Sequence, residues 1–219
     1  VQPPSRELVH DYVTHVGGDP AKYTDHIPPH LFPQWTFDAA TQTLVETPYP
    51  LTRAMNGGCR MEVNSKLPYD EPFQVTATLA DIDDNGRRAV LHQELVTETN
   101  GNPRAVVGHM YVVVPLASSS SSKTKDKPTV PESAHEMQRW SLKSNAGLDF
   151  AILTGDFNLI HWIPPLAKAS GFDNTILHGF STFARSCESL RHRVLDGGQR
   201  LQTVDVQFTR PLVLPADVG

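Results

Sequence analysis

The stretch FQVTATLADIDDNGRRAVLHQELVTETNGNPRAVVGHMYVVVPL, residues 73–116, decides the fold. It alternates β-branched and other apolar residues with polar ones, and it is interrupted at Asp84-Asn85-Gly86 and at Asn100-Gly101-Asn102. Asn-Gly steps accept the positive φ angles that tight hairpin turns require. The pattern therefore predicts three consecutive antiparallel strands joined by two hairpins.

A serine-rich segment separates this region from the rest of the chain. Residues 117–132 read ASSSSSKTKDKPTVPE. Such a sequence has few apolar side chains to bury, so we expect it to be flexible. The sequence thus predicts an amino-terminal domain at 1–116, a flexible linker at 117–134 and a carboxy-terminal domain at 135–219.

The second domain begins with three predicted helices. NAGLDFAILTG, residues 145–155, reads as a short helix that ends at Gly155, and PPLAKAS, residues 164–170, as one that begins at prolines and ends before Gly171. Residues 177–195 place apolar side chains at three- and four-residue steps, which is typical of a helix with one buried face. Alternation returns in LQTVDVQFTRPLVLP, residues 201–215, and predicts strand there.

The two halves resemble each other. VGGDPAKYTDHIPP, residues 16–29, echoes LTGDFNLIHWIPP, residues 153–165, and GGCRMEVNSKLPYD, residues 57–70, echoes GGQRLQTVDVQFTRPLVLPAD, residues 197–217. A duplication is the economical explanation. The first copy is followed by about 45 residues rich in strand pattern, whereas the second is followed only by Val218 and Gly219. Either the chain is truncated, or another segment supplies the missing edge of the second sheet.

Composition limits the class of protein. An apolar share of 39% suits a packed core, and a formal net charge of −5 with scattered basic residues argues against a nucleic-acid partner. Cys59 and Cys187 are too few for a disulfide framework, which favours a reducing compartment. No apolar run is long enough to span a membrane, and no secretory signal opens the sequence, although a removed leader stays possible because the chain begins at Val1. We expect a cytoplasmic protein, or one of the mitochondrial matrix or peroxisome if the source is eukaryotic.

Asp156, Asn158 and His161 bring proton-transfer chemistry to the segment LTGDFNLIHW, residues 153–162. A carboxylate and an imidazole are the usual groups for moving protons, because burial can bring their pKa values together. Positions five apart diverge by about 140° on a regular helix, so Asp156 and His161 converge only if the chain between them is a loop, as Gly155 suggests. A turn aspartate and a packed histidine are the structural alternative.

A second polar stretch, TILHGFST, residues 175–182, stands where the long helix is predicted to begin. The free N–H groups and the dipole of a helix start favour a developing negative charge. Gly179 would allow a substrate carbonyl to approach the backbone closely, as an oxyanion site requires. The alternative is that glycine fits a crowded helix start.

Residues 153–182, LTGDFNLIHWIPPLAKASGFDNTILHGFST, resemble the hydratase-2 signature of MaoC-like (R)-specific enoyl-thioester hydratases and dehydratases. That signature runs Gly-Asp-x-Asn-Pro-Leu-His and ends in Ile-Leu-His-Gly. The resemblance implies an α+β double hotdog, in which an antiparallel sheet wraps around a central helix in each half. The first half would be a degenerate hotdog, because aligning Gly18-Asp19 with Gly155-Asp156 puts Thr24 and not a histidine at the place of His161. The second half would be a catalytic hotdog that lacks its last strands. The positions in register with the signature are Asp156, Asn158, His161, Pro164, Ala167, Gly171, Phe172, Ile176, Leu177, His178 and Gly179.

The resemblance also implies a reaction, the reversible hydration of trans-2-enoyl thioesters to (R)-3-hydroxyacyl thioesters. Asp156 and His161 would activate the water, Asn158 would orient the loop or the water, and the N–H of Gly179 would bind the thioester oxygen. No metal or redox cofactor is implied, the acyl group would be carried on coenzyme A or acyl carrier protein, and a homodimer is expected. The residues expected to contact substrate are Phe157, Trp162, Ile176, His178, Ser181, Phe32 and Trp35.

Two positions depart from the signature. Leu159 stands where the family has proline, so the loop loses a fixed φ angle and depends more on tertiary packing. Ile163 stands where the family has an aspartate beyond the catalytic histidine, which puts the pKa of His161 in question.

Two other functions compete with hydration. Acyl-thioesterases share the hotdog fold and need a carboxylate on or beside the central helix, where Glu188 is the candidate. A non-catalytic acyl-binding or subunit-pairing module is the other. Metal binding is disfavoured for His10, His15, His26 and His30. Their spacings suit neither a helical pair of ligands nor a zinc knuckle, and no cysteine or tight carboxylate cluster joins them.

Overall fold

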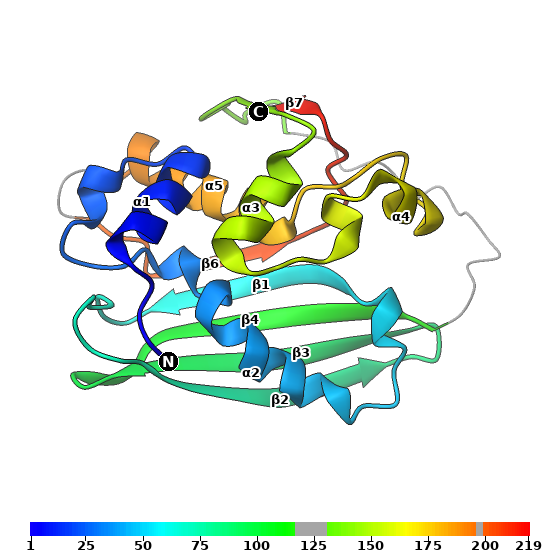
Figure 1. Ribbon diagram of the computed structural model, residues 1–219, viewed down its shortest axis with the longest axis horizontal. Helices are drawn as coiled ribbons and strands as arrows, with labels where there is room; N and C mark the ends of the chain where they lie inside the picture. Colours follow the sequence, from blue (N-terminus) through cyan, green and yellow to red (C-terminus); the bar gives the residue numbers. More distant parts are fainter. Residues whose placement is uncertain (117–130, 196–198) are drawn as a thin grey trace.

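The computed structural model describes residues 1–116, 131–195 and 199–219, and its main feature is a five-stranded antiparallel sheet. The strands stand in the order β2-β3-β4-β1-β6, and the helices gather on one face of the sheet (Figure 1). The α+β class predicted from the sequence is confirmed. The strands of this sheet are β1 (Met55–Val63), β2 (Gln74–Asp84), β3 (Arg88–Thr99), β4 (Asn102–Pro115) and β6 (Thr203–Gln207).

The meander predicted at residues 73–116 is confirmed. β2 pairs with β3 from Gln74 opposite Glu98 to Asp84 opposite Ala89, and β3 pairs in turn with β4. At the first hairpin Gly86 has a φ of 75°, and its N–H donates to the side chain of Asp84 at 2.7 Å. The Asn-Gly step thus supplies the backbone angle that the turn needs.

One face of the sheet is buried beneath the helices. Along β3 the side chains alternate, so that Ala89, Leu91 and Leu95 are fully buried while His92 and Glu94 lie on the opposite, partly exposed face. Burial of alternate residues is expected of a strand that packs a core on one side only. The helices of the first half are α1 (Arg6–His15), η1 (Pro20–Tyr23), η2 (Pro29–Leu31), α2 (Pro33–Val45) and η3 (Leu51–Arg53).

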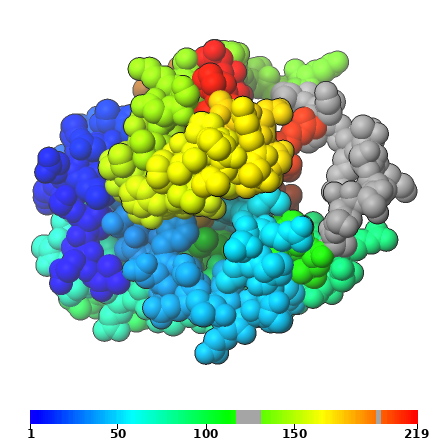
Figure 2. Space-filling model, turned by 45° about the vertical axis from the view of Figure 1, so that its right-hand side comes forward, coloured from blue at the N-terminus to red at the C-terminus, as the bar shows by residue number. Residues whose placement is uncertain are grey.

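The predicted helices of the second half are confirmed. α3 (Ala146–Thr154) ends at Gly155, which has a φ of 80°, and α4 (Pro164–Ala169) ends just before Gly171, with a φ of 91°. η4 (Leu159–His161) lies between them, and α5 (Gly179–Arg193) is the long amphipathic helix. In the space-filling view α4 lies directly above α2 and η3 (Figure 2). The second half therefore lies beside the helices of the first half, on the same face of the sheet (Figure 1).

The duplication read from the sequence is visible in the fold. The order α1, η1, α2, β1 in the first half matches α3, η4, α5, β6 in the second, and β1 and β6 are neighbours in the sheet. Gly17 and Gly155 follow the first helix of each half with the same φ of 80°. An isolated bridge pairs Ile27 with Leu67 in one half and Ile176 with Val213 in the other. Since Gly17 matches Gly155, the residue at the place of His161 is Tyr23 rather than Thr24.

The second half is short of strands, as predicted. Its strand β6 joins the sheet of the first half, but the strand predicted over residues 201–215 ends at Gln207, and residues 208–215 add no further strand to that sheet. A separate two-stranded sheet consists of β5 (Trp140–Leu142) and β7 (Ala216–Val218). Of the predicted linker, residues 117–134, the part at 117–130 lies outside the described residues. No helix in the described parts of the chain is long and apolar enough to cross a membrane.

Candidate active site

Asp156 and Asn158 shape the loop between α3 and η4. The left-handed Gly155 ends α3 and turns the chain, and the carboxylate of Asp156 accepts the N–H of Asn158 at 3.3 Å. Asn158 in turn caps η4, because its side-chain oxygen accepts the N–H of Ile160 at 3.4 Å. Asn158 is exposed, so in this structure it orients the loop. Leu159, the departure from the family's proline, begins η4 and is 44% exposed.

His161 is buried and its tautomer is fixed. Its Nδ1–H donates to the carbonyl oxygen of Ile176 at 2.8 Å, which leaves Nε2 as the free proton acceptor. Burial lowers the pKa of His161 below 6.5, although the hydrogen bond to Ile176 and the charge of Asp156 oppose the shift. Burial raises the pKa of Asp156 above 3.8, opposed by His161 and by the N–H of Asn158. His161 is therefore a neutral base at pH 7.

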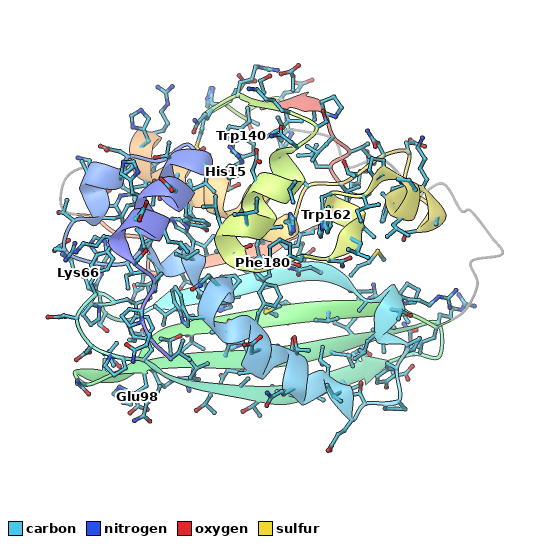
Figure 3. All side chains as sticks on the ribbon, in the orientation of Figure 1. His15, Lys66, Glu98, Trp140, Trp162 and Phe180 are labelled. Carbon is cyan, nitrogen blue, oxygen red and sulfur yellow. The ribbon has the colours of Figure 1, made fainter. Side chains whose placement is uncertain are left out.

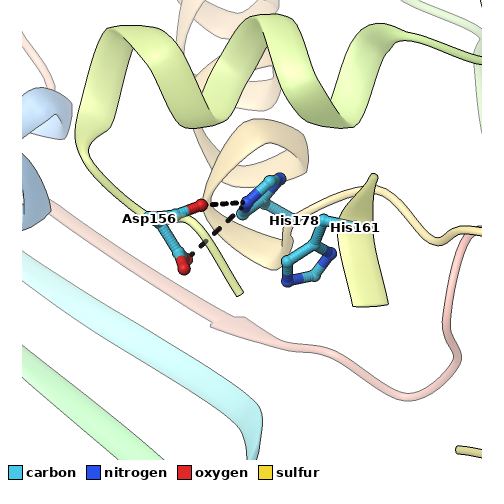
Figure 4. Close-up of side chains that lie close together, drawn as sticks. All are labelled: Asp156, His161 and His178. Carbon is cyan, nitrogen blue, oxygen red and sulfur yellow. Dashed lines mark hydrogen bonds and ion pairs between the residues drawn. The ribbon is translucent and has the colours of Figure 1, made fainter. Parts of the chain in front are cut away.

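His178 joins these two residues from the start of α5 (Figure 4). Its Nε2–H donates to the backbone carbonyl of Asp156 at 2.9 Å, and the carboxylate of Asp156 lies 3.9 Å from the same nitrogen. Its ring stacks on that of His161 with centroids 3.6 Å apart and planes at 25°. Burial and the neighbouring His161 lower the pKa of His178 to about 3. His178 is thus a neutral residue that holds the Asp156 loop against α5.

The backbone of His161 packs directly on α3. A Cβ at Gly147 would overlap the carbonyl oxygen of His161, so only glycine fits at this position of the helix. The place of His161 is therefore set from two sides, by Gly147 through the backbone and by Ile176 through the ring.

The start of α5 faces an aromatic side chain. The N–H groups of Ser181 and Thr182 bond to the carbonyl of His178, and no bond from the N–H of Gly179 is found within the described residues. A Cβ at Gly179 would lie 2.7 Å from the ring of Phe208, which follows β6. The space left by the missing side chain is filled by Phe208, so glycine is required there for packing as well as for any oxyanion role.

The donor set at this site is poorly shaped for a metal ion. One donor atom each from Asp156, His161 and His178 lies within 4.8 Å of the others, the one such grouping in the described residues. An imidazole directs its lone pair in the plane of its ring. Because the two rings are stacked nearly parallel, their lone pairs do not converge on one ion. Both rings also use one nitrogen to donate to a backbone carbonyl.

The residues predicted to contact substrate divide into three groups, two of which come from the second half. Ile176, His178 and Ser181 lie at the site and are buried, and the hydroxyl of Ser181 has no hydrogen-bond partner within the described residues. Trp162 donates from its indole to the carbonyl of Phe157, whose ring is 51% exposed.

Phe32 and Trp35, from the first half, are core residues. Phe32 is fully buried and meets Phe180 of α5 edge-on, with ring centroids 5.8 Å apart. Trp35 packs on Phe73 and its indole donates to Thr97 at 3.0 Å. Only Phe32 is therefore connected to the helix that carries the site.

Glu188 is not available for nucleophilic attack. Its carboxylate is 3% exposed and accepts hydrogen bonds from His30 Nε2, at 2.8 Å, and from the hydroxyl of Tyr23. Burial raises the pKa of Glu188, but the hydrogen bonds and charge of His30 more than offset it, so the carboxylate is ionised. It stands nine residues beyond Gly179 on α5, or about 13 Å along the axis. The carboxylate that a thioesterase would need is thus engaged and distant from the Asp156 site.

Sequence reasoning missed Gly147, Phe208 and the positioning role of His178. Gly147 lies inside a predicted helix, where glycine costs stability relative to alanine, and that cost was a signal of close packing. No comparable signal marked Phe208, because its contact with Gly179 depends on the pairing of β6 with β1.

The part of the chain that contains the site is similar to a known protein family. Residues 126–219 match the model of the MaoC like domain. The chain is 26% identical over 180 residues to the mouse protein peroxisomal multifunctional enzyme type 2, covering 77% of this chain and 24% of that protein. It is 26% identical over 167 residues to enoyl-CoA hydratase ChsH3 of Mycobacterium tuberculosis, covering 74% of this chain and 58% of that one. The chain thus spans from about a quarter to about three fifths of these relatives.

Solved structures share the fold. The crystal structure of HtdX from Mycobacterium tuberculosis superposes with a TM-score of 0.74 at 18% identity, covering all of this chain and 84% of that one. The structures that share the fold include a double hotdog. Together with the matching element order of the two halves, this confirms the double hotdog predicted from the sequence.

Proposed function

Because residues 126–219 of this chain are a MaoC-like domain, we propose that the protein catalyses the reversible addition of water to a trans-2-enoyl thioester. The product in this proposal is the (R)-3-hydroxyacyl thioester, and Asp156 and His161 activate the water. The relative named enoyl-CoA hydratase supports the reaction class. The observation that carries the mechanism is the hydrogen bond from His161 to Ile176, because it makes Nδ1 the donor and leaves Nε2 of His161 as the acceptor, in a residue whose ring approaches Asp156 to within 4.8 Å.

The spacing of the pair suits one bridging water. Two hydrogen bonds of ordinary length from a single water reach acceptors about 4.6 Å apart. The donor atoms of Asp156 and His161 lie within 4.8 Å of each other. In the forward reaction the water oxygen bonds to C3 of the enoyl group while one member of the pair removes a proton from it, and a proton is returned from the pair to C2.

The charge that develops on the thioester oxygen needs a donor. The N–H of Gly179, at the start of α5, is assigned this role, since the helix start offers an unpaired donor and a favourable dipole. The hydroxyl of Ser181, in the first turn of the helix, is buried and has no partner among the described residues, and it is assigned to contact the substrate. The acyl carrier in this proposal is coenzyme A or acyl carrier protein.

The reaction as proposed needs no metal. The stacking of His161 on His178 leaves no shared direction for two imidazole ligands. Protein treated with a chelator and then freed of it is expected to keep its hydration rate, and restoration of a lost rate by added zinc or magnesium would reverse this part of the proposal.

The experiment follows two products at once. Crotonyl-CoA and longer trans-2-enoyl thioesters, on coenzyme A and on acyl carrier protein, are incubated with the protein while the conjugated double bond and free thiol are measured. Loss of the double bond without thiol release, with only the (R)-alcohol on chiral chromatography, supports the proposal. Thiol release indicates a thioesterase instead, and the absence of both reactions on every substrate favours a binding module.

A further inference from the structure

A cavity lies where the first half repeats the position of the active site. It has a volume of about 420 Å³ and is lined by Tyr23, which stands at the place of His161, and by Ile27, which matches Ile176. From α5 it is lined by Cys187 and Arg191. Arg191 stands 12 residues beyond Gly179, or about 18 Å along the helix. The cavity is therefore separate from the Asp156 site.

The labelled side chains agree with this separation. Lys66, which lines the cavity, and Trp162, beside His161, lie on opposite sides of the molecule (Figure 3). A volume of this size is within the range of small-molecule sites.

The cavity is cationic in a chain of net negative charge. Four basic side chains line it, Lys22, Lys66, Arg191 and Arg200, against the single carboxylate of Asp25. Lys66 and His26 are paired with that carboxylate. Within the described residues Lys22, Arg191 and Arg200 form no ion pair. The chain as a whole carries a formal charge of −5, so this concentration of cations is local.

The wall behind the cations is held rigidly. The guanidinium of Arg191 lies over the ring of Tyr23, 4.5 Å from its centre, and donates to the backbone carbonyl of Lys22 at 3.4 Å. Tyr23 and His30 both bond to the buried carboxylate of Glu188, and the hydroxyl of Tyr12 lies 3.1 Å from Nδ1 of His30. These groups are satisfied by one another, so the wall is preorganised before any ligand arrives.

One polar atom of the wall is unsatisfied, and part of the cavity surface is apolar. The hydroxyl of Ser65 has no accessible surface and no hydrogen-bond partner within the described residues. Pro29, Leu195 and Leu201 also line the cavity, and because they are only partly buried they supply its apolar surface. A ligand with an anionic group and an apolar body complements both kinds of wall.

We propose that this cavity binds an organic anion, with its charged group beside Lys22 and Arg200 and its apolar body against Pro29, Leu195 and Leu201. The charged group is a carboxylate or a phosphate. The site differs from the one at Asp156 and does not depend on hydration activity.

Two probes distinguish the sources of the charge. Calorimetric titration of the whole chain with decanoate tests an apolar carboxylate, and titration with adenosine 3′,5′-bisphosphate tests the phosphate end of a coenzyme A-like molecule. Binding of one of them at one site per chain, with a Kd below about 1 mM, is expected. Failure of both to bind overturns the proposal.

Variants assign the binding to the cavity. The double substitution Lys22→Gln and Arg200→Gln is expected to weaken binding at least tenfold, while the matched pair of exposed cations outside the cavity, Lys143→Gln and Arg210→Gln, leaves it within twofold. Ser65→Trp, which fills the cavity, is expected to abolish binding without loss of the folded circular dichroism spectrum. Unchanged binding by the Lys22 and Arg200 variant contradicts the proposal, as does a loss of binding in Asp156→Asn, because the ligand would then occupy the other site.

Discussion

The imidazole rings of His161 and His178 stack with their centroids 3.6 Å apart, and each ring donates one N–H to a backbone carbonyl. A proton added to either ring would place a charge beside the other ring in a buried site, which is unfavourable. Burial lowers the pKa of both rings, and the neighbouring His161 lowers the pKa of His178 further. The arrangement keeps His161 neutral and ties the Asp156 loop to the start of α5.

The rate of hydration should therefore depend on pH in a defined direction. His161 accepts a proton only when neutral, and its lowered pKa preserves the neutral form below pH 6.5. The pKa of Asp156 is raised, so on acidification its carboxylate becomes protonated at a pH higher than the ordinary value of 3.8. We expect kcat/KM to be level from pH 8 to pH 7 and to fall on an acidic limb centred between pH 6.5 and pH 3.8. A limb centred above pH 6.5 in a stopped-flow pH profile would contradict a buried neutral base.

Stability should also fall on acidification because of His178. The pKa of His178 is about 3 in the folded protein and 6.5 when the ring is exposed. Below pH 6.5 the unfolded state therefore binds more protons, which stabilises it relative to the folded state. The loss is about 1.4 kcal/mol per pH unit until the folded pKa is reached. Urea unfolding at pH 7 and pH 5 should show about 2 kcal/mol less pH dependence in His178→Gln than in the natural sequence. Equal pH dependence in the two proteins would mean that His178 is protonated in the fold.

Gly147→Ala tests how the backbone of His161 is placed. Alanine is favoured over glycine inside a helix by about 1 kcal/mol, so helix propensity alone predicts a gain in stability. Overlap of the new Cβ with the carbonyl oxygen of His161 predicts the reverse, a loss of about 1–3 kcal/mol and a fall in kcat of about a hundredfold. Chemical denaturation and steady-state rates measure both.

Gly101→Ala is the control for that substitution. A Cβ at Gly101 meets nothing within 4 Å, and its φ is not in the left-handed region. Both stability and rate should stay close to those of the natural protein. A Gly147→Ala protein that behaves like this control would show that the loop of His161 yields without cost.

Gly179 and Phe208 form a pair whose contributions can be separated. Gly179→Ala places a Cβ 2.7 Å from the ring of Phe208 and should destabilise the fold by about 1–3 kcal/mol. Phe208→Ala removes the clashing ring. Gly179→Ala should therefore cost less stability in the Phe208→Ala background than in the natural sequence. Strict additivity of the unfolding free energies would show that the two residues do not contact.

Much of this structure was predictable from sequence, and the exceptions have a common cause. The meander followed from Asn-Gly turns and alternation, and α3 from its terminal Gly155, because these are local properties of the chain. Asp156 and His161 were found together because the loop between them is short. The stacking of His178 on His161 and the contact of Phe208 with Gly179 join segments far apart in sequence. Their geometry depends on the packing of the halves, which no local pattern records.

The repeat shows the same limit. Sequence similarity placed Thr24 opposite His161, whereas the left-handed Gly17 shifts the register by one and places Tyr23 there. Backbone conformation, rather than residue identity, decides which position is equivalent.

The central claim is that Asp156 and His161 together activate water. The most direct measurement is kcat/KM for loss of the enoyl double bond in Asp156→Asn and His161→Ala, with circular dichroism and unfolding midpoints to verify the folds. Each substitution should lower kcat/KM by about a thousandfold, and the double variant should be little worse than either alone, because the two residues act as a unit. Retention of kcat/KM within tenfold by either folded variant would contradict the account.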